Sequence, residues 1–414
     1  MKKLFALLLA MIMVCSLCVC GTAAFAEETE IEPCELRFTY WADDTDKSAL
    51  MQDIVAKFNA ENEYGITVIA EEQPWNGGGY STDLFNTCMG GGSPDIATWK
   101  LTATPMFVNN DLLADLTPFL ESWEGKSDID DNLWDVMQKA GGVDGATYVM
   151  PWNVQVLYTY YRPSYFEEAG IEVPTTYEEL LAAIEKCTVD KDGDGTPDVY
   201  GWGMRGASGG QEPWGCFMTA YGGTFEDFTT EEAVKGMQDF IDIYTKGFCP
   251  PTATGDGFAE TVANFKSGLT AMFIHHIGSS KGMVEELGDD VDAFIFPGTW
   301  TSMGDTETVI FEECENKAAA FEFVKYMATG EGQVMWCEGT GQVPVSKTVQ
   351  QMDYFQNDKF MKVSAEGMGI ASPLPILDTT TELVSEWPNL VGQALTGAKT
   401  AEETMEAMQA ILYN

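Results

Sequence analysis

Apolar and polar positions along this chain follow two periods in turn. Short apolar runs rich in aromatic or β-branched residues predict strands at residues 36–41, 66–70, 94–99, 269–274 and 292–296. Apolar residues at helical spacing indicate helices over residues 47–61, 80–89, 213–221, 231–244, 258–267, 316–329 and 401–412. Strands and helices therefore alternate, which predicts an α/β fold with mainly parallel sheets.

The stretch 150–184 joins an extended run to two helix signals. Aromatic and β-branched residues alternate with others over residues 154–160, which predicts a strand. A helix is expected over residues 165–170, ending at Gly170, where a left-handed cap costs little. Thr175 or Thr176 is placed to cap the next helix, with Glu178 or Glu179 closing a capping box. We interpret this stretch as a crossing between two halves of the molecule.

The length of 414 residues exceeds one ordinary core and predicts two domains. Residues 1–26 have the basic start, apolar run and small residues of a secretory signal peptide, with cleavage expected after Ala26. A second interpretation is a weak lipobox that anchors the protein through Cys20. Both interpretations predict that the protein is exported through the cytoplasmic membrane and is located at the extracellular face or in the periplasm.

Charge excludes one class of partner. The formal net charge is −43, which repels nucleic acid and anionic lipid and favours a neutral, cationic or protein partner. The seven cysteines beyond residue 26 are scattered without a CxxC pair, so no disulfide scaffold or zinc cluster is predicted.

An acidic loop has the spacing of a calcium site. Asp190, Asp192, Asp194 and Asp198 place oxygens at alternate positions around Gly195, but the Glu that an EF-hand needs at its twelfth position is replaced by glycine. A structural Ca²⁺ and a solvated acidic turn both remain open, and no other cofactor is expected.

Enzymatic motifs are weak. Ser208 lies in a G-x-S-x-G pattern, but the only histidines are His275 and His276, whose side chains are expected on opposite faces of a strand. Acidic pairs such as Asp43 with Asp44 arise readily among 65 acidic residues, so they do not identify a glycosidase.

Tryptophan is the informative excess. The chain has eleven, and many lie at predicted strand ends or in loops rather than within helical stripes. Each alone is more typical of a core, but together they suit a cleft that stacks sugar rings on aromatic faces.

The order of several segments resembles the sugar-binding family of extracellular solute-binding proteins of bacterial ABC importers, which includes maltose-binding protein. The resemblance spans the mature chain and rests on FTYW, GGSPDIATW, the 150–184 crossing, GWGMRG, SGLTAMFIHH, NKAAAFEFVKYMATGEGQ, GTGQVPVSK and the helix of Trp387. It implies two α/β lobes with the periplasmic-binding-protein fold, joined by two or three hinge strands near residues 154–157, 303–309 and 341–344. Lobe one would comprise residues 27–153 and 305–340, and lobe two residues 154–304 and 341–414.

The resemblance also implies a function without chemistry. A monomeric protein would bind a carbohydrate, most simply an oligosaccharide, between its lobes, close around it and dock on the membrane permease. Carried over by position, the ligand-binding residues would be Trp41, Asp95, Trp152, Asn153, Trp214, His276, Trp300 and Trp387, followed by Trp75, Tyr80 and Arg205.

Three other functions remain open from the sequence, one of which is a calcium-stabilised adhesion module built on the acidic loop. The excess of acidic residues would suit a cationic or peptide solute, whose affinity would fall steeply with salt. A secreted glycosidase or esterase is the less favoured alternative.

Overall fold

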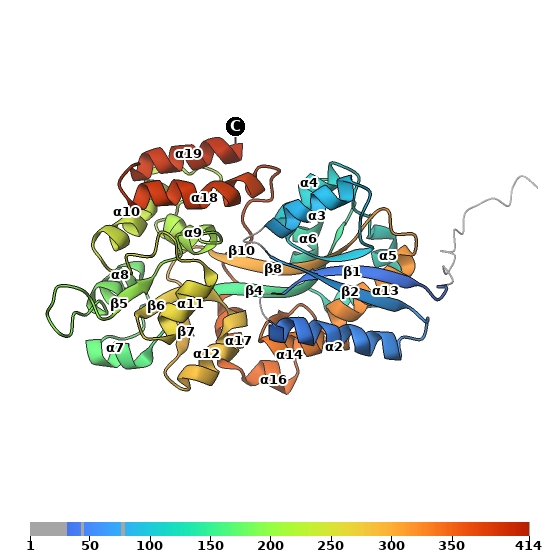
Figure 1. The fold of residues 1–414 in the computed structure, drawn as a ribbon, viewed down its shortest axis with the longest axis horizontal. Helices are drawn as coiled ribbons and strands as arrows, with labels where there is room; N and C mark the ends of the chain where they lie inside the picture. The colour runs from blue at the N-terminus through green and yellow to red at the C-terminus, as the bar shows by residue number, and fades with distance from the viewer. Residues whose placement is uncertain (1–30, 43–44, 76–78, 414) are drawn as a thin grey trace, which may run out of the picture.

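The computed structural model describes residues 31–42, 45–75 and 79–413. The predicted signal peptide, Cys20 and the pair Asp43 and Asp44 lie outside the described residues. Two lobes lie side by side and share strands that run from one to the other (Figure 1).

Lobe one is built from the first part of the chain and one later return. Its elements are β1 (Glu35–Trp41), α2 (Thr45–Glu61), β2 (Thr67–Gln73), α3 (Gly79–Met89), β3 (Ile96–Trp99), α4 (Thr104–Val108), α5 (Thr117–Ser122), α6 (Asp131–Ala140), α13 (Lys317–Thr329) and α14 (Glu331–Thr340). Lobe two contains α7 (Pro163–Ala169), α8 (Tyr177–Lys186), β5 (Tyr200–Gly203), α9 (Gln211–Thr219), α10 (Glu231–Thr245), α11 (Phe258–Lys266), β6 (Thr270–His276), α12 (Ser280–Leu287), β7 (Asp292–Phe294), α18 (Thr380–Leu395) and α19 (Ala401–Tyr413).

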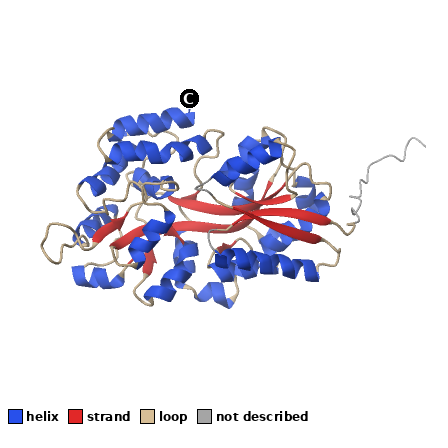
Figure 2. Ribbon diagram, viewed as in Figure 1, coloured by secondary structure: helices blue, strands red, loops and turns tan. Residues whose placement is uncertain are grey.

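Two long strands connect the lobes. β4 (Val149–Tyr161) and β8 (Thr301–Ile310) run antiparallel through both of them, and β9 (Val343–Pro344) adds a short third crossing beside Asn153 and Val154. The path through the sheet is β2-β1-β3-β8-β4-β6-β5, parallel for β2-β1-β3 and for β6-β5. Helices cover both faces of this sheet (Figure 2). The predicted two-lobed α/β fold is confirmed, and the antiparallel crossing pair makes the whole sheet mixed.

β4 is buried on both faces, unlike a strand with one wet side. Of its thirteen residues only Gln155 and Tyr161 are partly exposed. The alternation seen in the sequence therefore marks two packed faces rather than an inner and an outer one.

Two hydrophobic clusters form the cores. The first surrounds β1 to β3 and α13, and the second lies among α9, α10, α18 and α19. The helices α15 (Lys347–Gln350), α16 (Asp353–Asn357) and α17 (Lys359–Gly367) join the first cluster, and Asp128 of lobe one accepts hydrogen bonds from Ser346 and Thr348. The first cluster also contains Tyr160 and Phe273 of lobe two, and α17 packs beside β4 and β7, so membership of this cluster does not assign these helices to one lobe. The predicted lobe boundaries stay a prediction.

The local signals after the crossing are confirmed. Gly170 ends α7 with φ 63° and ψ 43°, the left-handed conformation. Thr176 caps α8, accepting from the backbone N–H of Glu179, whose carboxylate returns to the Thr176 N–H at 3.2 Å.

Thr176→Ala should lower the free energy of unfolding by about 1 kcal/mol, because the first turn of α8 loses its side-chain acceptor. Urea denaturation measures the change, and Thr176→Ser, which keeps the hydroxyl, is the control. Equal losses for the two variants would contradict the capping role.

Candidate functional site

A cleft of about 530 Å³ separates the lobes. This volume falls within the range of roughly 300–1,000 Å³ that small-molecule sites have. Its walls come from both lobes and from the crossing strands, with the side chains Trp41, Lys47, Trp75, Lys100, Trp152, Gln155, Arg205, Gln211, Glu212, Phe258, His276, Trp336 and Gln342 among its lining.

Lobe one contributes an aromatic platform. Trp41 ends β1 and Trp75 follows β2, with their ring centroids 5.1 Å apart. Tyr80 stands edge-on to Trp41 at 4.9 Å, and its hydroxyl donates to the carbonyl oxygens of Thr39 and Thr98. Because Tyr80 is buried, it holds the platform rather than lining the cleft, and the same burial raises its pKa.

The crossing strand places Trp152 at the floor of the cleft. A register shift in the β4–β8 pairing between Pro151 and Asn153 leaves Trp152 opposite no ladder partner. Its carbonyl oxygen instead accepts from the side-chain amide of Gln333 in α14 at 2.7 Å, and its ring lies 4.8 Å from that of Trp336 in the same helix. Within the described part of the chain, the buried indole N–H of Trp152 has no acceptor.

Gln333 ties two crossings together. Its side-chain nitrogen also donates to the carbonyl of Ala328, and its side-chain oxygen accepts from the backbone N–H of Ser346 at 3.1 Å, next to β9. Gln333 is fully buried, so each of these groups depends on it for a partner.

Lobe two contributes His276, whose hydrogen bond defines the tautomer of its ring. The Nδ1 atom of His276 accepts from the N–H of Gly278 at 3.1 Å, so the proton of the neutral ring is on Nε2. Burial and the charges of Lys47, Lys100 and Arg205 lower the pKa of His276 well below its usual value. At neutral pH the ring is therefore an uncharged hydrogen-bond donor.

The two histidines are closer than expected. The rings of His275 and His276 lie 4.4 Å apart rather than on opposite faces. β6 ends at His276, where the chain turns into a short 3-10 helix, so strand alternation does not hold at this position.

Arg205 faces the cleft from a glycine-rich loop. Its Nε donates to the carbonyl of Ser208 at 2.9 Å. A Cβ on Gly209 would lie 1.9 Å from the guanidinium, and Gly209 also has φ +84°, so this close approach requires glycine.

Six of the eleven predicted ligand residues do not line the cleft: Tyr80, described above, and the five that follow. Trp214 and Trp387 are 1% and 0% exposed and pack on each other at 5.1 Å in the core of lobe two. Trp300 is buried there too and donates to Ser372. Asp95 lies just before β3, whereas Lys100 lies just after it, so the two residues are at opposite ends of the strand. The carboxylate of Asp95 accepts a hydrogen bond from the backbone N–H of Arg37. Asn153 is buried beside the cleft without lining it. In this arrangement the three tryptophans have no free face to stack a sugar.

Four residues that line the cleft were not predicted as ligand residues from the sequence: Lys47, Lys100, Phe258 and Trp336. A usable signal existed for Lys100, because it directly follows β3, as Trp41 ends the parallel neighbour β1, and ligand sites lie beyond the carboxyl ends of parallel strands. Trp336 lies inside a helix that was not predicted.

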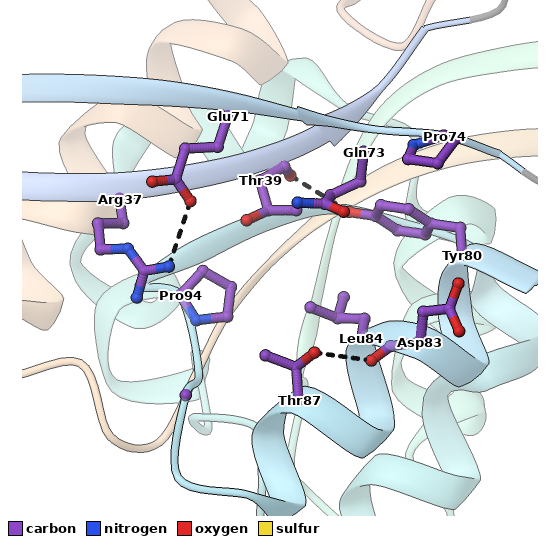
Figure 3. A pocket seen from close by; sticks show the side chains of 11 residues that line it. Arg37, Thr39, Glu71, Gln73, Pro74, Tyr80, Asp83, Leu84, Thr87 and Pro94 are labelled. Carbon is purple, nitrogen blue, oxygen red and sulfur yellow. Dashed lines mark hydrogen bonds and ion pairs between the residues drawn. The ribbon is translucent and has the colours of Figure 1, made fainter.

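A smaller hollow lies within lobe one. Its volume is about 80 Å³, and Figure 3 shows the Arg37 and Glu71 ion pair at one side and Tyr80 at the other. This hollow is well below the roughly 300 Å³ at which small-molecule sites begin, so it does not compete with the cleft.

Ser208 does not have the surroundings of a nucleophile. β5 and α9 do flank it, but through a loop of residues 204–210 rather than a sharp elbow. Within the described chain, Nδ1 of His275 meets Ser279 and Nδ1 of His276 meets a backbone N–H, so neither ring has the carboxylate that orients a catalytic histidine.

The acidic loop gathers three exposed carboxylates. Oxygens of Asp190, Asp192 and Asp194 lie within 4.8 Å of one another, while Asp198 accepts from the N–H of Lys191. The N–H of Gly195, followed by that of Gly193, stabilises the charged form of Asp190 and lowers its pKa. Calcium binding here stays a prediction.

The fold and the cleft together define a two-lobed binding protein. The chain belongs to the family described as bacterial extracellular solute-binding protein, whose model matches residues 53–363. The resemblance predicted from the sequence is thereby confirmed.

Individual relatives are distant. The alpha-glucosides-binding periplasmic protein of Rhizobium meliloti is 27% identical over 55% of each chain. A solute-binding protein of an ABC transporter from Thermotoga lettingae, solved with alpha-D-tagatose, has a TM-score of 0.80 at 21% identity, covering 91% of this chain and 98% of its own. The GacH receptor of Streptomyces glaucescens, solved with acarbose, has a TM-score of 0.79 at 20% identity over 92% and 100%.

None of the helices in the described ranges combines the length and apolar character that a membrane crossing requires.

Gln333→Met should lower the free energy of unfolding by about 2 kcal/mol, because it leaves buried backbone groups of Trp152 and Ser346 without partners. Urea denaturation measures this change. Gln351→Met, at an exposed position, is the matched control. Unchanged stability in Gln333→Met would contradict the linking role.

Calcium at about 1 mM should raise the melting temperature if the acidic loop binds it, since a ligand that binds only the folded state stabilises that state. The measurement is a thermal melt with Ca²⁺ or with chelator, and the rise should disappear in Asp190→Asn. If the melting temperature is the same with Ca²⁺ and with chelator, the loop does not bind calcium and is a solvated acidic turn.

Proposed function

We propose that this protein is the solute-binding component of an ABC importer and that it binds a carbohydrate in the interlobe cleft. The observation that carries the proposal is the cleft itself, in which the Trp41 and Trp75 platform of lobe one faces hydrogen-bonding side chains of lobe two. Aromatic faces stack the C–H faces of sugar rings, while amide and charged groups bond their hydroxyls.

The relatives support a sugar as the ligand class. The names of the relatives from Rhizobium and Pseudomonas specify alpha-glucosides and mannitol, and two solved neighbours carry tagatose and acarbose. The size of the cleft suits more than one sugar ring, and a second hollow of about 100 Å³ continues it past Gly304, sharing Trp75, Lys100 and Glu212.

Closure is part of the proposal, and the position of the cleft walls on both lobes supports it. A ligand that contacts both lobes stabilises the state in which they approach, and that state is the form we propose docks on the permease as a monomer. The protein then needs no catalytic group, which agrees with the surroundings of Ser208.

A cationic solute is less well supported. The relatives and solved neighbours named above specify alpha-glucosides, mannitol, tagatose and acarbose, which favours a carbohydrate over a cationic or peptide solute.

Trp41→Ala should weaken sugar binding roughly tenfold or more, because one stacking face is lost. A glycan panel in a thermal-shift assay finds the ligand, and calorimetry measures its affinity for the variant. Trp123→Ala, on lobe one outside the cleft lining, is the matched control. If no glycan in the panel binds the folded protein, the proposal is refuted.

The ligand found in that panel should also reduce the radius of gyration in solution scattering, because the lobes close over it. An unchanged radius with a bound sugar would contradict closure while leaving sugar binding intact.

A further inference from the structure

We propose that the ligand carries an acetamido group, as an N-acetylated hexosamine does, and that this group enters the hollow of about 100 Å³ that continues the cleft past Gly304. This inference rests on the proposed function and names the substrate class of the same cleft.

The first observation is a glycine that the fold does not require. Gly304 lies within β8, opposite Gln155 of β4. Its φ is outside the positive range that favours glycine, and the atoms nearest to an added Cβ would be those of Gln155 at 3.5 Å, an ordinary contact distance. Glycine inside a strand weakens the strand and often marks a place where a ligand approaches the backbone. Because Gly304 lines both the cleft and the hollow, its missing side chain keeps the passage between them open.

The second observation is the size and the lining of the hollow. Met303 of β8, Leu374 before α18 and Val384 within α18 place apolar side chains around it. Its volume of about 100 Å³ is below the roughly 300 Å³ at which sites for whole small molecules begin, and below the roughly 150 Å³ of a cavity that holds benzene. The hollow therefore accommodates a small substituent with an apolar part, rather than another sugar ring or an aryl group.

The third observation is a buried acceptor at the passage. Gln211 begins α9, lines both the cleft and the hollow, and is 6% exposed. Its side-chain oxygen Oε1 has no hydrogen-bond donor within the described part of the chain. A buried acceptor without a donor is costly, so a ligand that brings an N–H or O–H group to this wall removes that cost.

Together the lining and the acceptor select one substituent. A sugar hydroxyl can donate to Gln211 but leaves the apolar walls unfilled, whereas the methyl group of a deoxy sugar fills those walls and leaves Gln211 without a donor. An acetamido group has both parts, an N–H for the Gln211 oxygen and a methyl for the apolar walls. Its carbonyl oxygen can accept from the hydroxyls of Thr102 and Thr381, which also line the hollow.

Trp75 connects the hollow to the aromatic platform. It lines both spaces, and its ring centroid lies 5.1 Å from that of Trp41. A pyranose stacked on these two rings would hold one of its ring substituents at the passage beside Gly304. The platform thus binds the ring, and the hollow distinguishes what the ring carries.

The experiment uses matched ligands and the full mature chain. Calorimetry compares α- and β-linked oligosaccharides that differ only at C2, where they carry a hydroxyl, an amino or an acetamido group, and includes 6-deoxy forms of the hydroxyl series. We expect the acetamido form to bind at least roughly tenfold more tightly than its hydroxyl partner, because it adds one buried methyl group and one hydrogen bond.

Variants test the path into the hollow through the ratio of the acetamido affinity to the hydroxyl affinity. Gly304→Ala narrows the passage and should lower this ratio roughly threefold, and the larger side chain of Gly304→Val should bring it to about one. Gln211→Leu keeps the size of the side chain without the acceptor and should lower the ratio roughly fivefold.

The matched control is Gly282→Ala in α12. An added Cβ there meets nothing within 4 Å, and the position is outside the described lining of both spaces, so the ratio should stay unchanged. Circular dichroism and thermal melts establish that each variant is folded, and Gly304→Ala carries the test if Gly304→Val does not fold.

The other outcomes separate the two proposals. A hydroxyl form that binds as tightly as its acetamido partner overturns the acetamido ligand and leaves the sugar-binding function standing. Tightest binding of an amino or 6-deoxy form also overturns the acetamido group. An acetamido preference that survives intact in folded Gly304→Ala and Gln211→Leu overturns its placement in the hollow. Binding of no sugar by folded protein overturns the proposed function itself.

Discussion

The hydrogen-bond ladder between β4 and β8 is the constraint on which the rest of the molecule depends, because these strands carry the chain from one lobe to the other. A continuous ladder would join the lobes stiffly. The register shift at Trp152 interrupts it, and the freed carbonyl is taken by Gln333, which also holds Ser346 after the third crossing. At this position the side chain of Gln333, which is buried, connects β4 to the segment after β9. Trp152, whose carbonyl it binds, also lines the cleft.

The remaining walls follow from the direction of the strands on either side of this joint. β1 and β3 are parallel, so Trp41 and Lys100 arrive at the same sheet edge. Tyr80 holds that edge by bonding the carbonyls of both strands, so its ring contact with Trp41 is in place without a ligand. Preorganised walls reduce the ordering that binding must impose, so in the closure that we propose most of the conformational cost would fall on the movement of the lobes.

The sequence was sufficient for the fold and for part of the site. Local signals were explicit: Gly170 and the Thr176 capping box were where their chemistry placed them. Tryptophans were harder, because Trp41 and Trp214 look alike in a sequence. What separates them is the tertiary partner: Trp41 ends a strand at an open edge, whereas Trp214 lies within α9 and packs on Trp387 from a helix almost 170 residues later. No local pattern encodes that contact, and the same holds for Trp336 beside Trp152.

The net charge of the chain is a poor guide to the binding site, for a related reason. The value of −43 sums residues that are mostly on the outer surface, where they maintain solubility, and it carries no information on the few side chains that meet a ligand. This total favours a neutral, cationic or protein partner, and a neutral sugar is consistent with it. Lys47, Lys100 and Arg205 converge from separate helices, strands and loops, so their cluster exists only once both lobes are folded. Screening confines surface charges to their own surroundings, so contact chemistry in the cleft, not total charge, selects the ligand.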